Sequence, residues 1–315
     1  MGAELLKLTG SPEPPVRRPA LRRVVVLCSS MTGAGTTATA LNVAARLTRH
    51  GDVMLVDCDL TGSGVTAIAH PRAETFAEHG LNDVLQDGTY LAPAMLLAQA
   101  TPLRTAERVS AGADHIGELR LVPGRGGATT FADDFAKAGR PDDIDAGANC
   151  VDAREASRRL DELMALLADW SSSGSRERWV VLDVPPHPFV APLILDAVSR
   201  LAAADAEILE PGCPFPFLLI CFASNAEQIG QAARLHTRMG GRWQHADMLC
   251  ARGSLDAHDL RTHAAEPSAR TALPVIPFDQ ILFGGLQIVG AGSTAGTPAA
   301  SSYDALVEWL RRLDA

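Results

Sequence analysis

A run of small residues near the start of the chain has the composition of an anion-binding loop. Residues 29–35 follow the apolar stretch 24–28 and precede residues 36–50, which show helical spacing. Between a strand and a helix, such a loop turns backbone N–H groups toward an anion, with the helix N-terminus behind them. The chemistry it predicts is phosphate binding. The alternative is a tight glycine-rich turn without a ligand.

The loop meets the strict phosphate-loop pattern G-x-x-x-x-G-K-[ST] only in part. In the matching window, residues 30–37, Ser30 replaces the first glycine and Thr36 replaces the lysine. Gly35 and Thr37 keep the places of the second glycine and of the final hydroxyl residue. The strict pattern alone therefore does not decide between a phosphate loop and a turn.

The wider sequence resembles the ParA/MinD family of P-loop NTPases, which belongs to the SIMIBI class. Residues 31–44, MTGAGTTATALNVA, resemble its deviant Walker A motif, K-G-G-x-G-K-T-[ST]-x-A-x-N-x-A. The positions that match in place are Gly33, Gly35, Thr37, Ala40, Asn42 and Ala44. Four later segments resemble family motifs in the same order: DCDLTGS at 57–63, LRLVP at 119–123, WVVLDVPP at 179–186 and LPVIPFD at 273–279. The chain is identified as a divergent member. Its altered lysine position resembles that of the BcsQ and TadZ/CpaE branches, and its Gly-Thr-Thr triplet, residues 35–37, resembles the BcsQ branch.

The resemblance implies a site for ATP or ADP with Mg²⁺. The residues whose N–H groups would cradle the phosphates are Gly33, Ala34, Gly35, Thr36, Thr37 and Ala38. Pro277 would contact the nucleotide, Thr37 would place its hydroxyl on Mg²⁺, and Asp183 would hold a Mg²⁺-bound water. Asp57 would lie near the Mg²⁺ shell, and Asp59 would be catalytic by positioning the attacking water. The alternative for Asp57 and Asp183 is a strand-end cap on a loop.

Departures from the family motif put hydrolysis in question. Met31 stands where the family has its signature lysine, and Thr36 stands where it has the Walker A lysine. Loss of both cations removes electrostatic stabilisation of the transition state. We expect nucleotide binding with slow or absent hydrolysis, unless an arginine such as Arg125 or Arg252 substitutes. Ala251 stands where the family has an asparagine that contacts adenine, so base selectivity is also in question.

Elements that would position these residues alternate along the chain. Short apolar runs predict strands at 24–28, 53–56, 119–122, 179–182, 217–222, 248–250 and 275–276. Helical spacing predicts helices that include 36–50, 153–170, 226–239 and 303–313. Alternating strands and helices predict an α/β fold with a doubly wound, mostly parallel sheet.

The organisation predicted along the chain is a flexible tail over 1–20 followed by a single domain over 21–315. Residues 124–150 read as an irregular insertion, and residues 290–301 read as a small-residue linker to the last helix. That helix has few basic residues on its polar face, so we expect it to pack against the domain and not to bind membrane directly.

Composition limits the compartment and the partners. The net charge of −9 argues against a surface that generally attracts nucleic acid or anionic lipid. The six cysteines form no C-x-x-C pair, which excludes close-spaced zinc and thioredoxin-like sites and is typical of a reducing compartment. The start of the chain has no secretory h-region, and no stretch has the length of a membrane helix. The expected location is the cytoplasm.

Three functions remain open. The first is a spatial-positioning or assembly switch that forms an ATP-dependent homodimer and binds a protein partner. The second is a pseudo-ATPase scaffold subunit of a secretion or pilus-type assembly. The third is a DNA-binding partition ATPase, against which the acidic charge and Met31 both count.

Overall fold

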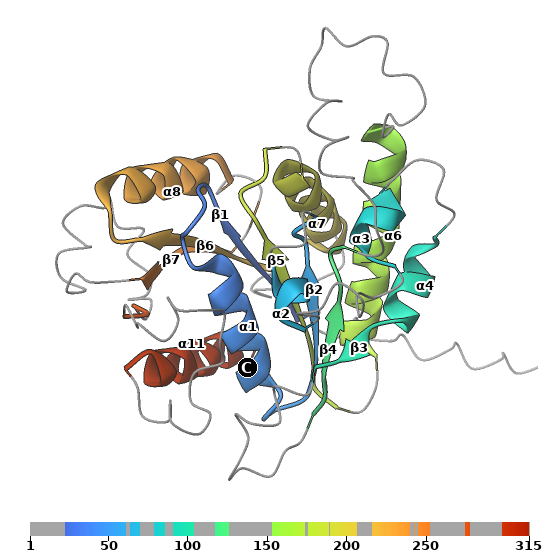
Figure 1. The fold of residues 1–315 in the computed structure, drawn as a ribbon, viewed down its shortest axis with the longest axis horizontal. Helices are drawn as coiled ribbons and strands as arrows, with labels where there is room; N and C mark the ends of the chain where they lie inside the picture. The colour runs from blue at the N-terminus through green and yellow to red at the C-terminus, as the bar shows by residue number, and fades with distance from the viewer. Residues whose placement is uncertain are drawn as a thin grey trace, which may run out of the picture.

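The computed structural model describes residues 23–60, 64–69, 79–85, 91–103, 117–125, 153–173, 176–188, 190–206, 216–239, 243, 245–252, 275–277 and 298–314. Within them a seven-stranded sheet has the order β3-β4-β2-β5-β1-β6-β7 (Figure 1). The predicted tail over 1–20 and most of the predicted insertion, 126–150, lie outside the described residues.

The strands of this sheet, in chain order, are β1 (Val24–Ser29), β2 (Asp52–Asp57), β3 (Thr101–Pro102), β4 (Leu119–Val122), β5 (Arg178–Val184), β6 (Phe217–Ala223) and β7 (Ala246–Arg252). Every neighbouring pair is parallel except β3 with β4. The doubly wound, mostly parallel sheet is therefore confirmed. Apolar, β-branched residues form the central strands because those strands are covered on both faces.

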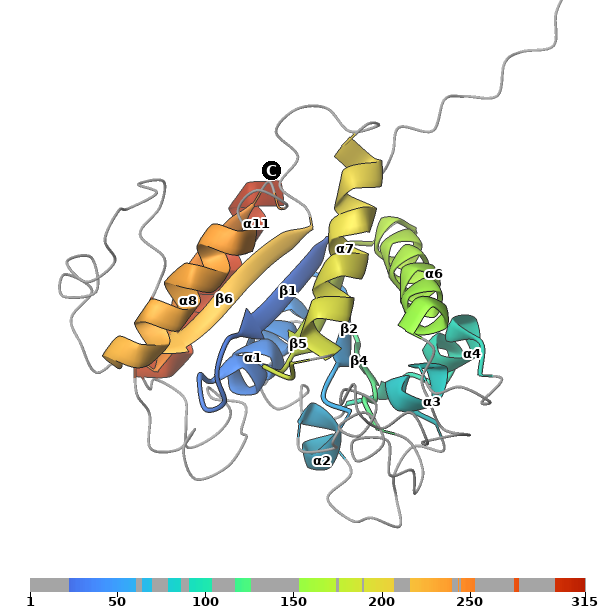
Figure 2. The same ribbon diagram turned by 90° about the horizontal axis from the view of Figure 1, so that it is seen from above.

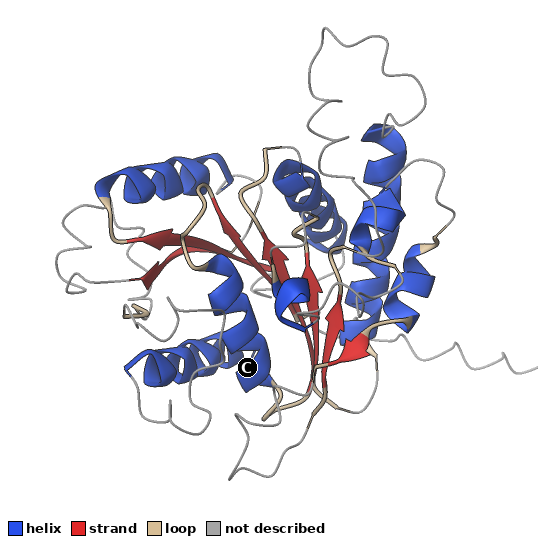
Figure 3. Cartoon of the chain, in the orientation of Figure 1, coloured by secondary structure: helices blue, strands red, loops and turns tan. Residues whose placement is uncertain are grey.

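Helices occupy both faces of the sheet (Figures 2 and 3). They are α1 (Thr36–Leu47), α2 (Val65–Ala69), α3 (Leu81–Leu85), α4 (Pro93–Ala98), α6 (Ala153–Ser172), α7 (Val190–Ala206), α8 (Ala226–Met239) and α11 (Pro298–Asp314). None of these described helices is long and apolar enough to cross a membrane.

Alternating side chains along each strand divide the core between the two faces. In β1, Val24, Val26 and Cys28 pack in the cluster that includes α3, α4, α6, α7 and α8. Val25 and Leu27 face the opposite way, toward α1 and α11. This division follows from the two-residue period of a strand, and Figure 1 shows α7 and α8 above the sheet with α1 and α11 below it.

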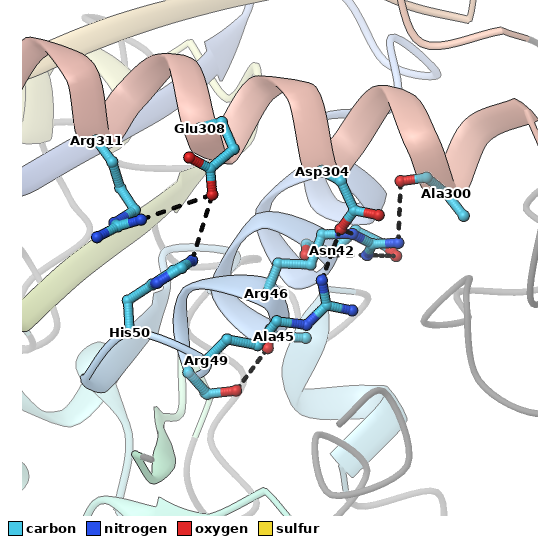
Figure 4. Close-up of polar contacts among 10 residues, drawn as sticks. Asn42, Ala45, Arg46, Arg49, His50, Ala300, Asp304, Glu308 and Arg311 are labelled. Carbon is cyan, nitrogen blue, oxygen red and sulfur yellow. Dashed lines mark hydrogen bonds and ion pairs between the residues drawn. The ribbon is translucent and has the colours of Figure 1, made fainter. Parts of the chain in front are cut away.

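The last helix packs against α1, as expected, but it begins earlier than expected. Helix α11 starts at Pro298, so residues 298–301 of the predicted linker are helical. Its apolar side, including Leu306 and Leu310, is buried in the core. Arg46 of α1 joins the two helices: its side chain is 1% exposed and its Nε lies 2.9 Å from Oδ1 of Asp304 (Figure 4). Small residues such as Ala299 and Ala300 allow this close contact between the helices. The same small residues carry no helical pattern, which is why the sequence indicates a linker there.

Two edge features differ from the prediction. Residues 275–276 do not form a strand of their own, although Ile276 N–H donates to the carbonyl of Cys250 at 2.9 Å. The short edge strand β3 was not predicted, because two residues, one of them Pro102, carry too little pattern.

Candidate functional site

The candidate site lies at the carboxyl end of β1, where the winding of the sheet reverses. Strand β1 pairs with β5 on one side and β6 on the other. The chain leaves β1 through α1 on one face and leaves β5 through α7 on the opposite face. Open α/β sheets bind ligands at such a switch point, outside the carboxyl ends of the strands.

The loop after β1 has the backbone that its glycines predict. Gly33 and Gly35 have φ values of 77° and 85°, a left-handed conformation that residues other than glycine rarely adopt. Gly35 is the N-cap of α1 and supplies no side-chain cap, and the first turn of α1 has no acidic residue. The N-terminus of α1 thus keeps its partial positive charge and its unpaired N–H groups available for an anion.

Asp57, at the end of β2, is engaged by the loop that follows it. Its Oδ1 accepts the N–H of Asp59 at 2.9 Å. Its Oδ2 accepts the N–H and the hydroxyl of Thr66 at 2.7 and 2.6 Å. A Cβ at Gly64 would lie 2.5 Å from Asp57 Oδ1, so glycine is required for this close approach. These contacts are those of a strand-end cap, and Asp57 thus fits the alternative role as well as a place beside Mg²⁺.

Asp183, in β5, differs from Asp57 despite being its direct neighbour in the sheet. Its carboxyl is fully buried, and neither oxygen has a hydrogen-bond partner among the described residues. The hydroxyl of Thr37 lies beside it, although without the geometry of a hydrogen bond. Asp183 therefore does not act as a loop cap within the described chain. A buried carboxylate without a partner is costly, so this environment favours either a bound cation or a proton on Asp183.

The pKa values of Asp57 and Asp183 depend on burial and on the neighbouring carboxyl groups. Burial raises the pKa of Asp57 to about 6, and the hydrogen bonds from Thr66 and Asp59 oppose the shift. Burial raises the pKa of Asp183 well above its ordinary value, and the negative charges of Asp57 and Asp59 add to it. Because the two groups interact, they titrate as a pair.

The stability of the ligand-free protein is expected to fall as pH rises toward neutrality. A carboxyl with a raised pKa binds its proton more tightly in the folded state than in the unfolded state. The folding stability that this proton adds is present in full below pH 4 and is lost as pH rises through about 6. For Asp57 this loss is on the order of 3 kcal/mol. Urea unfolding between pH 4 and 8 measures it, and Asp183→Asn should give a flatter curve. An unchanged curve in that variant would contradict the coupling.

Asp59 lies beside the pair and is 8% exposed. Its charge acts on Asp183 and on His187, a residue that sequence reasoning missed. His187 Nδ1 accepts the N–H of Val190 at 3.3 Å, and burial lowers the pKa of His187 while Asp59 raises it. The imidazole thus lies near the expected catalytic aspartate, with Nδ1 as a hydrogen-bond acceptor. The sequence signal was its place directly after the WVVLDVPP segment.

The positions of the two missing lysines hold no cation. Met31 is half-buried in the loop. Thr36 is 6% exposed, and its hydroxyl lies beside the buried thiol of Cys221 without a hydrogen-bond partner among the described residues. Arg125, a candidate substitute, follows Gly124, whose N–H donates to the hydroxyl of Thr66 at 3.0 Å. The side chain of the other candidate, Arg252, is not described.

Pro277 and Ala251 lie apart from this group of carboxyls. Residues 275–277 run beside the end of β7, which is two strands away from β1. Ala251 is 2% exposed and packs in the core cluster on the α1 side. The structure thus brings together the loop 33–38, Asp57, Asp59 and Asp183 at one edge, and it places Pro277 toward the side of the sheet.

The residues present fit a hydrated Mg²⁺. In the described part of the chain, no three His, Cys, Asp or Glu side chains group as a metal site of their own. Mg²⁺ keeps several waters and takes one or two protein oxygens together with phosphates, so it does not need such a group. The oxygens of Asp183, which no described residue contacts through a hydrogen bond, lie next to the Thr37 hydroxyl and are oxygens of that kind.

Comparison with known proteins identifies the fold. No family model and no curated protein matches the sequence. Among solved structures, the cell-division protein MinD of Aquifex aeolicus matches with a TM-score of 0.55 and 15% identity over 93% of this chain and 96% of that one. An ATP complex of McdA(D38A) from Cyanothece matches with a TM-score of 0.57 and 15% identity, over 93% and 97%. A putative plasmid partition protein of Borrelia burgdorferi B31, bound to AMPPNP, matches with a TM-score of 0.56 and 14% identity, over 92% of this chain and 98% of that one. The chain therefore has the fold of the ParA/MinD-type P-loop NTPases.

Proposed function

We propose that this protein is a nucleotide-dependent switch of the ParA/MinD type, which acts in the cytoplasm in spatial positioning or assembly. It binds ATP or ADP with Mg²⁺, forms a homodimer when ATP is bound, and then binds a protein partner. The observation that carries the proposal is the pairing of an α1 N-terminus without a side-chain cap with the carboxyl of Asp183, which has no hydrogen-bond partner among the described residues. The ATP and AMPPNP complexes of the same fold support the ligand class.

Each part of the site has a defined task in this proposal. The N–H groups of residues 33–38 bind the phosphates, and Asp183 and the Thr37 hydroxyl hold the Mg²⁺. Mg²⁺ neutralises phosphate charge when it is bound. Asp57 keeps the loop after β2 in place through Thr66, and Asp59 orients the water for hydrolysis. Pro277 contacts the nucleotide from the segment that runs beside β7.

A second candidate is a pseudo-ATPase scaffold subunit of a secretion or pilus-type assembly. Met31 and Thr36 favour it, because neither supplies the positive charge that phosphoryl transfer uses. A DNA-binding partition ATPase is a third candidate, and the net charge of −9 counts against it.

Nucleotide binding without appreciable turnover is the expected result for the isolated protein. Backbone N–H groups bind phosphate whatever side chains they carry, whereas catalysis needs the missing cations. Calorimetry with ATP and with ADP, each with Mg²⁺, measures binding, and phosphate release measures turnover. Absence of binding to both nucleotides would exclude the switch. Turnover that Asp59→Ala abolishes would exclude the scaffold.

A further inference from the structure

Gln228, in the first turn of α8, is buried against the phosphate loop although it belongs to none of the sequence motifs. Its side chain is 8% exposed. Oε1 accepts the N–H of Ala223 at 2.7 Å, and Nε2 donates to the carbonyl of Thr32 at 3.3 Å. One amide end meets a donor and the other meets an acceptor, so the partners determine its orientation.

The amide reaches the loop from a firmly held helix start. Gln228 N–H donates to Oδ1 of Asn225 at 2.7 Å, which is the hydrogen bond of an N-cap. Ile229 N–H donates to the carbonyl of Asn225 at 3.0 Å, and Ile229 is buried in the core. The end of β6, the first turn of α8 and the phosphate loop therefore meet at one side chain.

The contact with Thr32 orients a neighbouring N–H group. The carbonyl of Thr32 and the N–H of Gly33 belong to the same planar trans peptide, so they point in opposite directions. Holding this carbonyl on the α8 side turns the Gly33 N–H away from α8. Gly33 carries no side chain that could anchor this peptide, and a Cβ built there would meet nothing within 4 Å. The hydrogen bond from Gln228 is therefore a constraint that the Gly33 side of the peptide does not provide through a side chain.

We propose that Gln228 is a positioning residue of the phosphate loop, which sets the direction of the Gly33 N–H before a ligand arrives. The role of that N–H in holding phosphate rests on the proposed function, whereas the orientation of the peptide does not. A neutral amide performs the task on a loop where both family lysines are replaced. Holding the backbone donors in place before binding thus provides part of the phosphate affinity that the lysine charges would provide.

Three variants of the full-length protein test the proposal. Gln228→Glu keeps an acceptor for the N–H of Ala223 but places a carboxylate oxygen against the carbonyl oxygen of Thr32. It therefore removes only the contact with the loop. Gln228→Ala removes both contacts. Gln231→Ala is the matched control, since Gln231 lies about one turn further along α8, is half-buried, and its side chain makes no hydrogen bond among the described residues.

The first measurement is the backbone order parameter of the Gly33 amide in the ligand-free protein, by nuclear magnetic resonance. We expect a lower value in both Gln228 variants and an unchanged value in Gln231→Ala. The second is the Kd of ATP with Mg²⁺, which should rise about fivefold to tenfold in both Gln228 variants, as expected for one lost hydrogen bond to a ligand-binding segment.

The two measurements separate the possible failures. If the unmutated protein binds no nucleotide, the proposed function fails, and the order parameter still tests the constraint on Gly33. An unchanged order parameter in Gln228→Glu overturns the proposal. A loss of melting temperature in that variant with unchanged order and unchanged Kd also overturns it, because it would show a purely structural role.

Discussion

Asparagine at position 183 is expected to stabilise the ligand-free protein and to abolish most Mg²⁺-dependent nucleotide binding. The carboxyl of Asp183 is fully buried, has no hydrogen-bond partner among the described residues and is repelled by Asp57. An isosteric neutral amide removes the buried charge, so we expect a gain of about 1–2 kcal/mol in unfolding free energy at pH 8. The amide is a poor Mg²⁺ ligand, so affinity for nucleotide with Mg²⁺ should fall roughly tenfold to a hundredfold.

Asp57→Asn is the matched control, because it makes the same chemical change at the paired position of the next strand. Asp57 accepts three hydrogen bonds, from Asp59 N–H and from the N–H and hydroxyl of Thr66. An asparagine keeps one acceptor atom there, so the lost hydrogen bonds, about 2 kcal/mol, offset the relief of the buried charge, and Asp57→Asn should lack the gain expected of Asp183→Asn. Urea unfolding and calorimetry with and without Mg²⁺ measure both effects. Destabilisation of similar size in the two variants would assign Asp183 the loop-cap role instead.

Arg46→Ala is expected to lower the unfolding free energy by about 3 kcal/mol. The guanidinium of Arg46 lies between α1 and α11, with Nε on Asp304 at 2.9 Å and Nη2 on the carbonyl of Ala300 at 3.3 Å. Its Nη1 also donates to Oδ1 of Asn42 at 3.2 Å, and its Cζ lies 5.3 Å from the Tyr303 ring centroid. The alanine leaves a cavity and unpaired groups between two buried helix faces.

Arg49→Ala serves as the comparison for Arg46→Ala. Arg49 contacts the same oxygen of Asp304, also at 2.9 Å, but its side chain is 32% exposed and that of Asp304 is 45% exposed (Figure 4). Water screens such a pair, so the loss should stay below about 1 kcal/mol. Thermal and urea unfolding of both variants provide the measurement. Equal losses would show that the ion pair with Asp304, and not the burial of Arg46, holds α11 against α1.

Much of the fold followed from local sequence. The apolar runs predicted β1, β2, β4, β5 and β6 closely, because a strand buried on both faces needs continuous apolar residues. The loop predicted after β1 is present, and its Gly33 and Gly35 have positive φ values that most other residues rarely adopt. The place of Asp57 and Asp183 at one sheet edge followed from their positions at the ends of parallel strands.

Other features depended on contacts between distant parts of the chain. Asp57 and Asp183 have the same side chain and similar strand-end contexts. Only the fold brings Thr66 to Asp57 and leaves Asp183 without a hydrogen-bond partner in the part of the chain that the structure describes. The start of α11 at Pro298 is decided by its packing on α1, because residues 298–301 are too small to form a helical pattern alone.

The sequence by itself determined the class of the sheet, the loop at the end of β1 and the acidic residues around it. Those features are local, as they depend on apolar periods, on glycine backbone freedom and on motif spacing. Only the tertiary structure decided which carboxyl has no hydrogen-bond partner within the described ranges, and that Gln228 donates to the carbonyl of Thr32, 196 residues away. A hydrogen bond between distant residues depends on how elements pack, and a side chain that makes one leaves no periodic trace in the sequence.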